Sequence, residues 1–495
     1  MNHNLLSFLF VVTAMMSHVS LLAKVDPPKP VLPVPTAEQV AWQRMETYAF
    51  IHYGPDTFYG EDGVEWGYGN YPVDLFNPTL GYCDVDQWVD ALQAGGMKGV
   101  IFTAKHHDGF CLWPTEYTDY SIKNSPYKQG KGDVVGELAE ACRKKGMKFG
   151  IYLSPWDRHQ ATYATPAYVD YYKKQLREVL SNYGELFEVW FDGANGGDGW
   201  YGGADEKRSI DKEHYYDFPT LFSYVRELQP QAIIFSNGGP GCRWVGSEEG
   251  VAGATCWSML RSADARPAFD ASYSMNGAED GDVWVPAECD VSIRRPNWFY
   301  HEADNAKGIL TADQLEDLYN KNVGHNATFL LNVPVTRTGR MHPTDVANLK
   351  AFREKLDRIY AHNLLVGSKV KGSHVRSSAY KAKNVLSDDY DSYWATPDGV
   401  CSASLTFKFC SKAQSFNRIV LQEYIPLGQR VKKFEVEYSL DGKSWTGIDC
   451  GEETTTIGYK RILVFPTVTA RMLRVRFLDA RGPLCINNIG AYLAE

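Results

Sequence analysis

The sequence has no surplus of basic residues. Its formal net charge is −9, and its lysines and arginines are scattered along the chain rather than massed in one stretch. Nucleic acids and anionic membrane surfaces attract clustered positive charge, so both are disfavoured as partners. A neutral ligand fits this charge balance better.

The usual patterns of a metal site are also missing. The 10 cysteines show no CxxC spacing, and the adjacent His106 and His107 are accompanied by neither an HExxH helix nor a cysteine ligand set. Neighbouring residues at a strand end point in different directions, so this pair alone does not make a zinc shell. We therefore predict no catalytic metal and no cofactor required for catalysis. The cysteine positions identify no disulfide pair.

No long membrane-spanning run is apparent. An apolar run over residues 5–16 is too short to cross a bilayer, and small polar residues follow it. This pattern predicts a signal peptide over residues 1–23 and an exported protein, periplasmic or secreted, without membrane insertion. No cysteine near the end of this segment offers a lipid attachment point, which favours a free protein over a lipoprotein. A proline-rich lead over residues 24–35 comes next.

Strand-like and helix-like segments alternate through the first two thirds of the chain. At 495 residues, the chain is long enough for a barrel and a smaller module. Five strands are expected at residues 49–52, 99–104, 149–153, 188–191 and 232–236, and candidates for three more at 256–259, 283–290 and 328–333. Amphipathic helices are expected at residues 84–94, 133–145, 167–181, 215–229, 311–322 and 343–362. Eight such units predict a (β/α)8-type TIM barrel over residues 36–362.

The pattern changes after His362. Short alternating runs separated by turns occupy the remainder, with strands expected at residues 404–409, 418–423, 431–439, 461–464 and 472–477. They predict a separate all-β sandwich of jelly-roll type over residues 363–495. No internal repeat or low-complexity tract is present.

Polar side chains follow the predicted barrel strands. Asp192 ends an apolar run before a glycine-rich stop, and the other strand ends or adjoining loops carry His52, Glu65, Trp66, His106, His107 and Tyr152. Carboxyl ends of barrel strands meet at one face, so these side chains are expected to share a site. The structural alternative is that the Asp192 carboxylate caps a turn by accepting hydrogen bonds from the following amides. The 13% aromatic content suits stacking on sugar faces, although a large aromatic core would explain it too.

A glycoside substrate would require a second carboxyl group. Glu248 lies in a glycine-flanked loop, where a group that gives and takes protons should be exposed to the cleft. Glu288 lies in a more apolar run, and its structural interpretation is a carboxylate paired with Arg294 or Arg295. The residues alone favour neither strongly.

Several segments in this order resemble the α-L-fucosidases of glycoside hydrolase family 29. They are Phe-Ile-His-Tyr-Gly at 50–54, Glu-Trp at 65–66, Lys-His-His-Asp-Gly-Phe at 105–110, Gly-Ile-Tyr at 150–152 and Trp-Phe-Asp-Gly at 190–193. The resemblance implies that Asp192 is the nucleophile of a retaining double displacement. It also implies a fucosylated oligosaccharide or glycoconjugate as substrate, bound through His52, Glu65, Trp66, His106, His107 and Tyr152.

Three later segments resemble the branch of this family restricted to α-1,3/4 linkages in branched, Lewis-type glycans. They are residues 243–250, 286–294 and 298–301. The resemblance implies that Glu248 is the acid/base, with Glu288 as the alternative, and that Arg294 and Trp298 contribute to substrate binding. Glu249 beside Glu248 leaves a one-residue ambiguity in this assignment.

Residues 373–495 resemble, less sharply, a discoidin-like (coagulation factor 5/8 type C) sandwich. Such modules bind carbohydrate or merely buttress an enzyme, and both alternatives stay open here, as does a structural calcium in this domain. Two other functions also stay open: a broad-specificity α-L-fucosidase, and a non-enzymatic protein that binds fucosylated glycans. The sequence does not indicate the oligomeric state.

Overall fold

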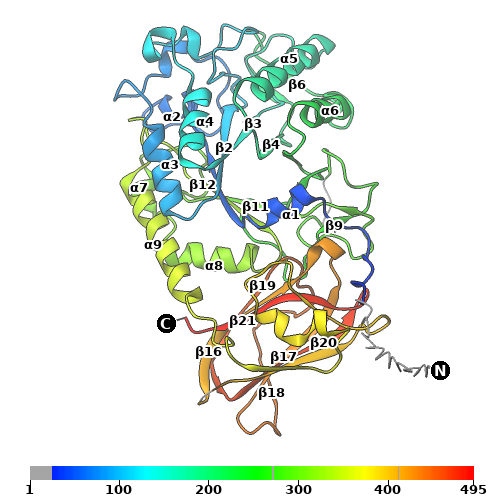
Figure 1. Ribbon diagram of the computed structural model, residues 1–495. Helices are drawn as coiled ribbons and strands as arrows, with labels where there is room; N and C mark the ends of the chain where they lie inside the picture. Colours follow the sequence, from blue (N-terminus) through cyan, green and yellow to red (C-terminus); the bar gives the residue numbers. More distant parts are fainter. Residues whose placement is uncertain (1–24, 270–272, 411, 495) are drawn as a thin grey trace, which may run out of the picture.

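The computed structural model describes residues 25–269, 273–410 and 412–494. It consists of a barrel followed by a β-sandwich, with the chain passing once from the first to the second (Figure 1). The predicted signal peptide over residues 1–23 lies outside the described residues. Within the described part of the chain, no helix is both long and apolar enough to cross a membrane.

Eight parallel strands close the barrel in the order β1-β12-β11-β8-β7-β4-β3-β2. Most of their residues are buried, which explains why they appear in the sequence as short, nearly continuous apolar runs. The predicted TIM-type barrel is therefore confirmed. The barrel strands are β1 Thr47–Ile51, β2 Gly99–Lys105, β3 Lys148–Leu153, β4 Glu188–Trp190, β7 Ile233–Ser236, β8 Cys242–Trp244, β11 Ala287–Ser292 and β12 Thr328–Asn332.

The sixth strand is not where the sequence predicted it. β8 takes this place, pairing with β7 on one side and β11 on the other. The expected strand at residues 256–259 instead contributes to β9 (Met259–Leu260), which pairs with β10 (Val283–Trp284) in a small antiparallel sheet outside the barrel. β8 has only three residues and follows β7 without an intervening helix, so neither its length nor its surroundings marked it as a barrel strand.

Amphipathic helices surround the barrel, close to their predicted positions. Local capping explains several of their ends: the side chain of Asp84 accepts a hydrogen bond from the Gln87 amide at the start of α3, and Asp133 accepts one from the Gly136 amide at the start of α4. Gly146 then ends α4 in the left-handed conformation that glycine adopts readily. The helices are α1 Ala37–Gln43, α2 Pro55–Phe58, α3 Val85–Ala94, α4 Val134–Lys145, α5 Pro166–Asn182, α6 Phe218–Leu228, α7 Asp304–Lys307, α8 Ala312–Asn322 and α9 Pro343–Tyr360.

The C-terminal domain is an antiparallel sandwich, as predicted. A five-stranded sheet, β13-β15-β20-β17-β18, faces a four-stranded sheet, β14-β21-β16-β19, across a separate apolar core. The strands are β13 Lys369–Gly372, β14 Trp394–Ala395, β15 Ala403–Lys408, β16 Gln414–Glu423, β17 Val431–Ser439, β18 Thr446–Gly447, β19 Arg461–Ala470, β20 Met472–Ala480 and β21 Cys485–Tyr492. A further small sheet pairs β5 Gly197–Gly199 with β6 Glu206–Arg208.

The sandwich contacts the barrel near the amino-terminal end of β1. Glu46, immediately before β1, forms an ion pair with Lys460 and accepts a hydrogen bond of 2.8 Å from the Tyr459 hydroxyl. His325 and Glu452 add a second contact between the domains, at 2.9 Å. Barrel enzymes carry their chemistry at the opposite, carboxyl-terminal end of the strands, so these contacts lie away from it.

Candidate active site

The predicted polar side chains gather in one pocket at the carboxyl ends of the barrel strands. The pocket has a volume of about 80 Å³. Every residue that lines it comes from the barrel domain: Phe50, His52, Trp66, His106, His107, Tyr152, Trp190, Asp192, Ala194, Glu248, Asp290 and Trp298. Eight of these were predicted from the sequence, namely His52, Trp66, His106, His107, Tyr152, Asp192, Glu248 and Trp298.

Asp192 lies just beyond the end of β4 and reaches into this pocket. Its carboxylate accepts hydrogen bonds from the Tyr152 hydroxyl at 2.9 Å and from the Ala194 amide at 2.6 Å, and Nε2 of His107 lies 3.7 Å away. Burial raises the pKa of Asp192, while the hydrogen bonds from Ala194 and Tyr152 oppose this shift by stabilising the anion. The side chain remains 21% exposed and lines the pocket.

The three pocket histidines are uncharged near neutral pH. Burial lowers the pKa of His52 and of His107 to about 3, and burial together with the neighbouring His107 puts the pKa of His106 well below its ordinary value. Nδ1 of His52 lies 2.9 Å from the Asn332 side-chain oxygen, and Nδ1 of His107 lies 2.7 Å from the Ser154 hydroxyl. Neutral imidazoles held in this way are suited to hydrogen bonding with sugar hydroxyls.

Glu65 ties together two loops at the rim of the pocket. Its carboxylate accepts hydrogen bonds from the backbone amides of Trp298, at 2.6 Å, and Phe299, at 3.2 Å, and lies 2.7 Å from Nε2 of His301. The neighbouring Trp66 is 54% exposed and meets the ring of His107 edge-on at 5.3 Å between centroids. Glu65 therefore holds Trp298 and Trp66 beside the same opening.

The structure separates the adjacent glutamates 248 and 249. Both lie in the turn after β8, but Glu248 lines the pocket and accepts a hydrogen bond of 3.2 Å from the Trp298 indole, whereas Glu249 forms an ion pair with Arg295. Burial of the carboxyl raises the pKa of Glu248, and the negative charges of Asp192 and Glu65 raise it further against the Trp298 hydrogen bond. The raised pKa favours the protonated form of Glu248, and its side chain lines the same pocket as Asp192.

Glu288 does not reach the pocket. It lies on β11 inside the barrel, fully buried, and accepts hydrogen bonds from the Tyr48 hydroxyl and, at 2.8 Å, from the Trp190 indole. The expected pairing of Glu288 with Arg294 or Arg295 is wrong, because those arginines have other partners. Arg295 pairs with Glu249, as described above.

Arg294 is also outside the pocket, contrary to its predicted role in substrate binding. Its guanidinium is completely buried, pairs with Asp345 of α9 at 2.8 Å and donates to the Asn305 side chain at 3.0 Å. The residue follows the end of β11, and its side chain connects Asp345 of α9 with Asn305 of α7 instead of lining the pocket. This position indicates a structural role.

Asp290 is a pocket residue that the sequence analysis missed. It is 4% exposed, lines the pocket and accepts a hydrogen bond of 2.8 Å from the Trp244 indole. Burial, with a contribution from the charge of Glu248, raises its pKa well above the ordinary value. The available signal was strand alternation: Asp290 lies two residues after Glu288 on β11, so both point into the barrel and Asp290 is nearer the carboxyl end.

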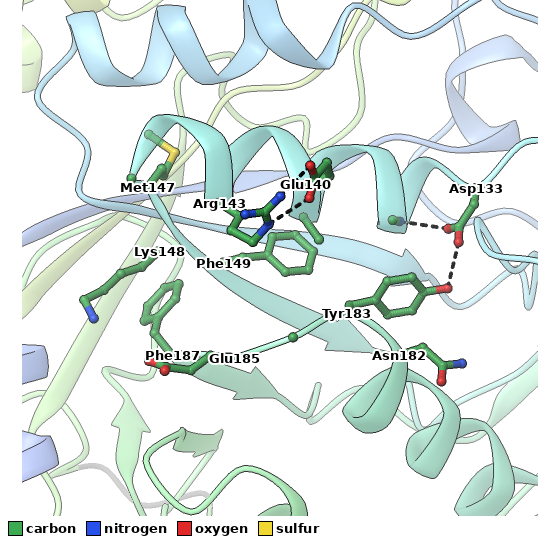
Figure 2. Close-up of a pocket in the computed structure, with 14 residues that line it drawn as sticks. Asp133, Glu140, Arg143, Met147, Lys148, Phe149, Asn182, Tyr183, Glu185 and Phe187 are labelled. Carbon is green, nitrogen blue, oxygen red and sulfur yellow. Dashed lines mark hydrogen bonds and ion pairs between the residues drawn. The ribbon is translucent and has the colours of Figure 1, made fainter.

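Larger cavities lie elsewhere on the barrel, and two of them bear on the location of the site. One, of about 670 Å³, is formed by α4, the start of β3 and the segment after α5; Figure 2 shows Arg143 beside Glu140 and Tyr183 beside Asp133 in its wall. It contains none of the predicted site residues. The other, of about 530 Å³, shares Asp192 with the small pocket and includes Asn195, Lys212, Asn237 and Trp244. The second cavity therefore adjoins the candidate site.

A metal centre is not indicated at the histidine pair. Across residues 25–269, 273–410 and 412–494, the one group with the spacing of metal ligands is Glu188, Cys242 and Glu288, inside the barrel below the pocket. His106 and His107 do not belong to it. Their rings lie 4.2 Å apart and pack against other aromatic rings of the pocket.

Comparisons with known proteins show the family of this chain. The alpha-L-fucosidase family model matches residues 31–358, and the F5/8 type C domain model matches residues 369–490. Alpha-L-fucosidase 1 of Arabidopsis thaliana is 42% identical over 473 residues, which cover 94% of this chain and 88% of the relative.

Solved structures of similar proteins share the fold over nearly the whole chain. A glycoside hydrolase 29 family member from an unknown rumen bacterium is 44% identical, with a TM-score of 0.82 over 95% of this chain and 78% of that one. A GH29 fucosidase of Ruminococcus gnavus, solved in complex with fucose, is 32% identical, with a TM-score of 0.83 over 95% of this chain and 97% of that one. The pocket of Asp192 and Glu248 thus lies in a chain that belongs to the α-L-fucosidases of glycoside hydrolase family 29.

Proposed function

We propose that this α-L-fucosidase is a retaining exo-enzyme that removes α-1,3- or α-1,4-linked L-fucose from branched, Lewis-type glycans. One observation carries the mechanistic part: Asp192 and Glu248 line the same small pocket, and the groups around each carboxyl differ. Asp192 accepts two hydrogen bonds that favour its anion, whereas burial, together with nearby negative charges, raises the pKa of Glu248 and favours its protonated form. A retaining glycosidase requires one carboxylate and one carboxylic acid in this relation.

In the first step, a carboxylate oxygen of Asp192 attacks the anomeric carbon of the fucosyl unit. The bond from that carbon to the glycosidic oxygen breaks, and this oxygen takes the proton of Glu248 as the rest of the glycan leaves. A covalent fucosyl-enzyme ester and an ionised Glu248 result. The Tyr152 hydroxyl and the Ala194 amide hold the attacking carboxylate in place during this step.

In the second step, Glu248 acts as a base. It removes a proton from a water molecule, whose oxygen attacks the anomeric carbon while the ester bond to Asp192 breaks. L-fucose leaves with its original anomeric configuration, and both carboxyl groups return to their starting states. Proton NMR of early hydrolysis tests this step: the α-anomer of fucose should accumulate first, and initial formation of the β-anomer would contradict retention.

The pocket residues suit a neutral deoxysugar. The three uncharged histidines offer ring nitrogens to hydroxyl groups, and Trp66, Trp190 and Trp298 offer apolar faces. The small volume supports binding of a single terminal unit, as exo-action requires. Specificity for one sugar arises in this arrangement because an analogue lacking a hydroxyl would leave buried donors or acceptors unpaired.

The adjoining cavity of about 530 Å³ supports the preference for branched glycans. It shares Asp192 with the fucose pocket and presents the polar side chains of Asn195, Lys212 and Asn237 together with apolar groups. A branched aglycone has more than one sugar to place next to the scissile bond, whereas a simple aryl fucoside does not. We therefore expect binding energy from the remote sugars to contribute to turnover.

The linkage preference is tested by comparing substrates. Fucose release is measured from a Lewis a or Lewis x trisaccharide, from 4-nitrophenyl α-L-fucoside, and from α-1,2- and α-1,6-linked disaccharides at equal concentration. The expected kcat/KM for the Lewis trisaccharides is at least about a hundredfold above the others. Comparable release from all four substrates would support the fucosidase activity but would replace the proposed linkage restriction with broad specificity.

A further inference from the structure

The barrel interior directly below the fucose pocket contains a pair of acidic side chains. On β4, the alternating residues Glu188, Trp190 and Asp192 point the same way, so Glu188 lies deepest. Glu188 and Glu288 are both 0% exposed, and oxygens of the two carboxyls lie within 4.8 Å of each other and of the Cys242 sulfur. TIM-barrel interiors are usually filled by branched apolar residues, so this pair is unusual.

Each oxygen of the pair faces a hydrogen-bond donor. Glu188 accepts from the Trp42 indole at 2.8 Å and from the Cys242 thiol at 3.7 Å. Glu288 accepts from the Trp190 indole at 2.8 Å and from the Tyr48 hydroxyl. Indole N–H groups can only donate, so the surroundings are built to hold carboxyl oxygens.

The pair has no positive partner. Neither carboxyl has an ion pair with a lysine, arginine or histidine in the described part of the chain. Two negative charges this close together in a dry interior would repel each other and lose their hydration. Burial raises the pKa of both carboxyls, and the charge of Glu288 raises that of Glu188 further.

Trp190 connects the pair with the catalytic pocket. Its ring lines the pocket, stacks on Phe235 at 3.9 Å between centroids with an interplanar angle of 5°, and stacks on Tyr152 at 5.3 Å and 28°. Tyr152 in turn donates its hydroxyl to Asp192 at 2.9 Å. Among the described residues, Glu288 is the one side chain that accepts a hydrogen bond from the Trp190 indole, and it therefore fixes the rotation of the indole at the base of the pocket.

We propose that Glu188 and Glu288 share a proton and act together as a positioning dyad, which holds Trp190 and, through Tyr152, the carboxylate of Asp192. This inference rests on the proposed role of Asp192 as nucleophile. Glu288 then acts only through Trp190 and takes no part in proton transfer to the substrate. The dyad also needs no metal ion.

The first test compares Glu288→Gln with Glu288→Leu. Glutamine keeps an acceptor for the Trp190 indole and supplies an N–H to Glu188, so kcat/KM should stay within about threefold of the parent. Leucine removes the acceptor, and kcat/KM should fall by about tenfold to a hundredfold. Both variants should keep the shape of the parent pH profile, because neither changes the acid or the nucleophile.

An acid/base role for Glu288 would give the opposite result. Glu288→Gln would then lose turnover by orders of magnitude, and azide would restore activity in Glu288→Ala with an activated fucoside, which would overturn the proposal. Asp192→Asn is measured in parallel. Activity surviving in Asp192→Asn would refute the proposed nucleophile instead, so the two failures are distinguishable.

The second test concerns the shared proton and does not depend on activity. A carboxyl whose pKa is raised by folding contributes stability that is present at low pH and is lost as the pH rises towards its folded pKa. The melting temperature of the parent should therefore fall, relative to that of Glu188→Gln, as the pH increases from about 5 to about 8. Melting temperatures of the parent and of Glu188→Gln that change in parallel with pH would contradict proton sharing. A rise in the parent's melting temperature on adding Zn²⁺, absent in Glu188→Gln, would show a metal site and overturn the dyad.

Discussion

Glu248 and Glu288 offer the most instructive comparison within this enzyme. Both are glutamates of the barrel, and burial raises the pKa of both. Glu248 lies in a turn at the rim, with one indole hydrogen bond and access to the pocket, whereas Glu288 is sealed in the interior with two donors on its oxygens. A raised pKa therefore identifies a catalytic acid only when the proton can reach a substrate.

The same comparison extends along β4. Asp192 at its tip and Glu188 four residues earlier share one face of the chain, yet only Asp192 lines the pocket. In the proposed mechanism, depth inside the barrel thus separates the carboxyl that reacts from the carboxyls that support it. The predictions below test this separation, beginning with the largest expected loss of activity.

Replacing Asp192 should have the largest effect. Asp192→Asn keeps the size of the side chain but removes the nucleophile, so kcat/KM should fall by about a thousandfold or more while the melting temperature changes little. Steady-state kinetics and thermal melting measure the two quantities. Asp198→Asn is a matched control on β5, where the carboxylate is 71% exposed and pairs with Arg158, and it should retain activity within about twofold.

Replacing each of the two adjacent glutamates in the turn after β8 should have very different effects on activity. Glu248→Ala should lose about a hundredfold to ten-thousandfold in turnover of the Lewis trisaccharide, and azide should rescue hydrolysis of an activated aryl fucoside. Glu249→Ala removes an exposed ion pair with Arg295 and should stay within about twofold of the parent. Equal losses in the two variants would mean that the turn as a whole, not the acid group, controls activity.

The buried histidines should make the protein sensitive to acid. His52 and His107 have folded pKa values of about 3, below the ordinary value of an exposed histidine, so each stabilises the fold at neutral pH and loses this contribution as the pH falls below about 6.5. The limiting slope is about 1.4 kcal/mol per pH unit for each histidine.

His107→Gln provides the measurement. Its free energy of unfolding, obtained from urea titrations between about pH 4.5 and 7, should decline less steeply than that of the parent. His214→Gln is the control, because this histidine is on the surface and pairs with Asp211. An identical decline in the parent and in His107→Gln would indicate that folding leaves the pKa of His107 unchanged.

Breaking the ion pair between Glu46 of the barrel and Lys460 of the sandwich should change activity least. Lys460→Met leaves Glu46 without its cation at a largely buried position, where burial alone would raise the pKa of Glu46 and Lys460 instead lowers it to about 2. We expect a loss of about 2 to 4 kcal/mol in stability and a change in kcat/KM within about twofold. Lys432→Met, at an exposed pair with Glu279, should cost at most about 0.5 kcal/mol. A large loss of activity in Lys460→Met would link the sandwich to the pocket.

The strands of the barrel were predictable where local signals were strong. The first five strands, and β12, are apolar runs bounded by turns or helices, and the structure has strands at those places. The sixth was misplaced because Cys242–Trp244 is short and becomes a barrel strand only by pairing with β7 and β11. Such pairing depends on residues far away in the chain, which no local pattern reports.

Local sequence patterns were sufficient to locate most of the barrel strands, the change from barrel to sandwich, and the residue types that meet at the strand ends. Strand alternation and turn chemistry are local properties, so they can be recognised without a structure. The folded structure was needed to show which of two neighbouring glutamates faces the pocket, that Arg294 pairs with Asp345, and that Asp290 lines the site. The direction of each of these side chains depends on partners that folding brings from distant segments, and on the burial that those partners create.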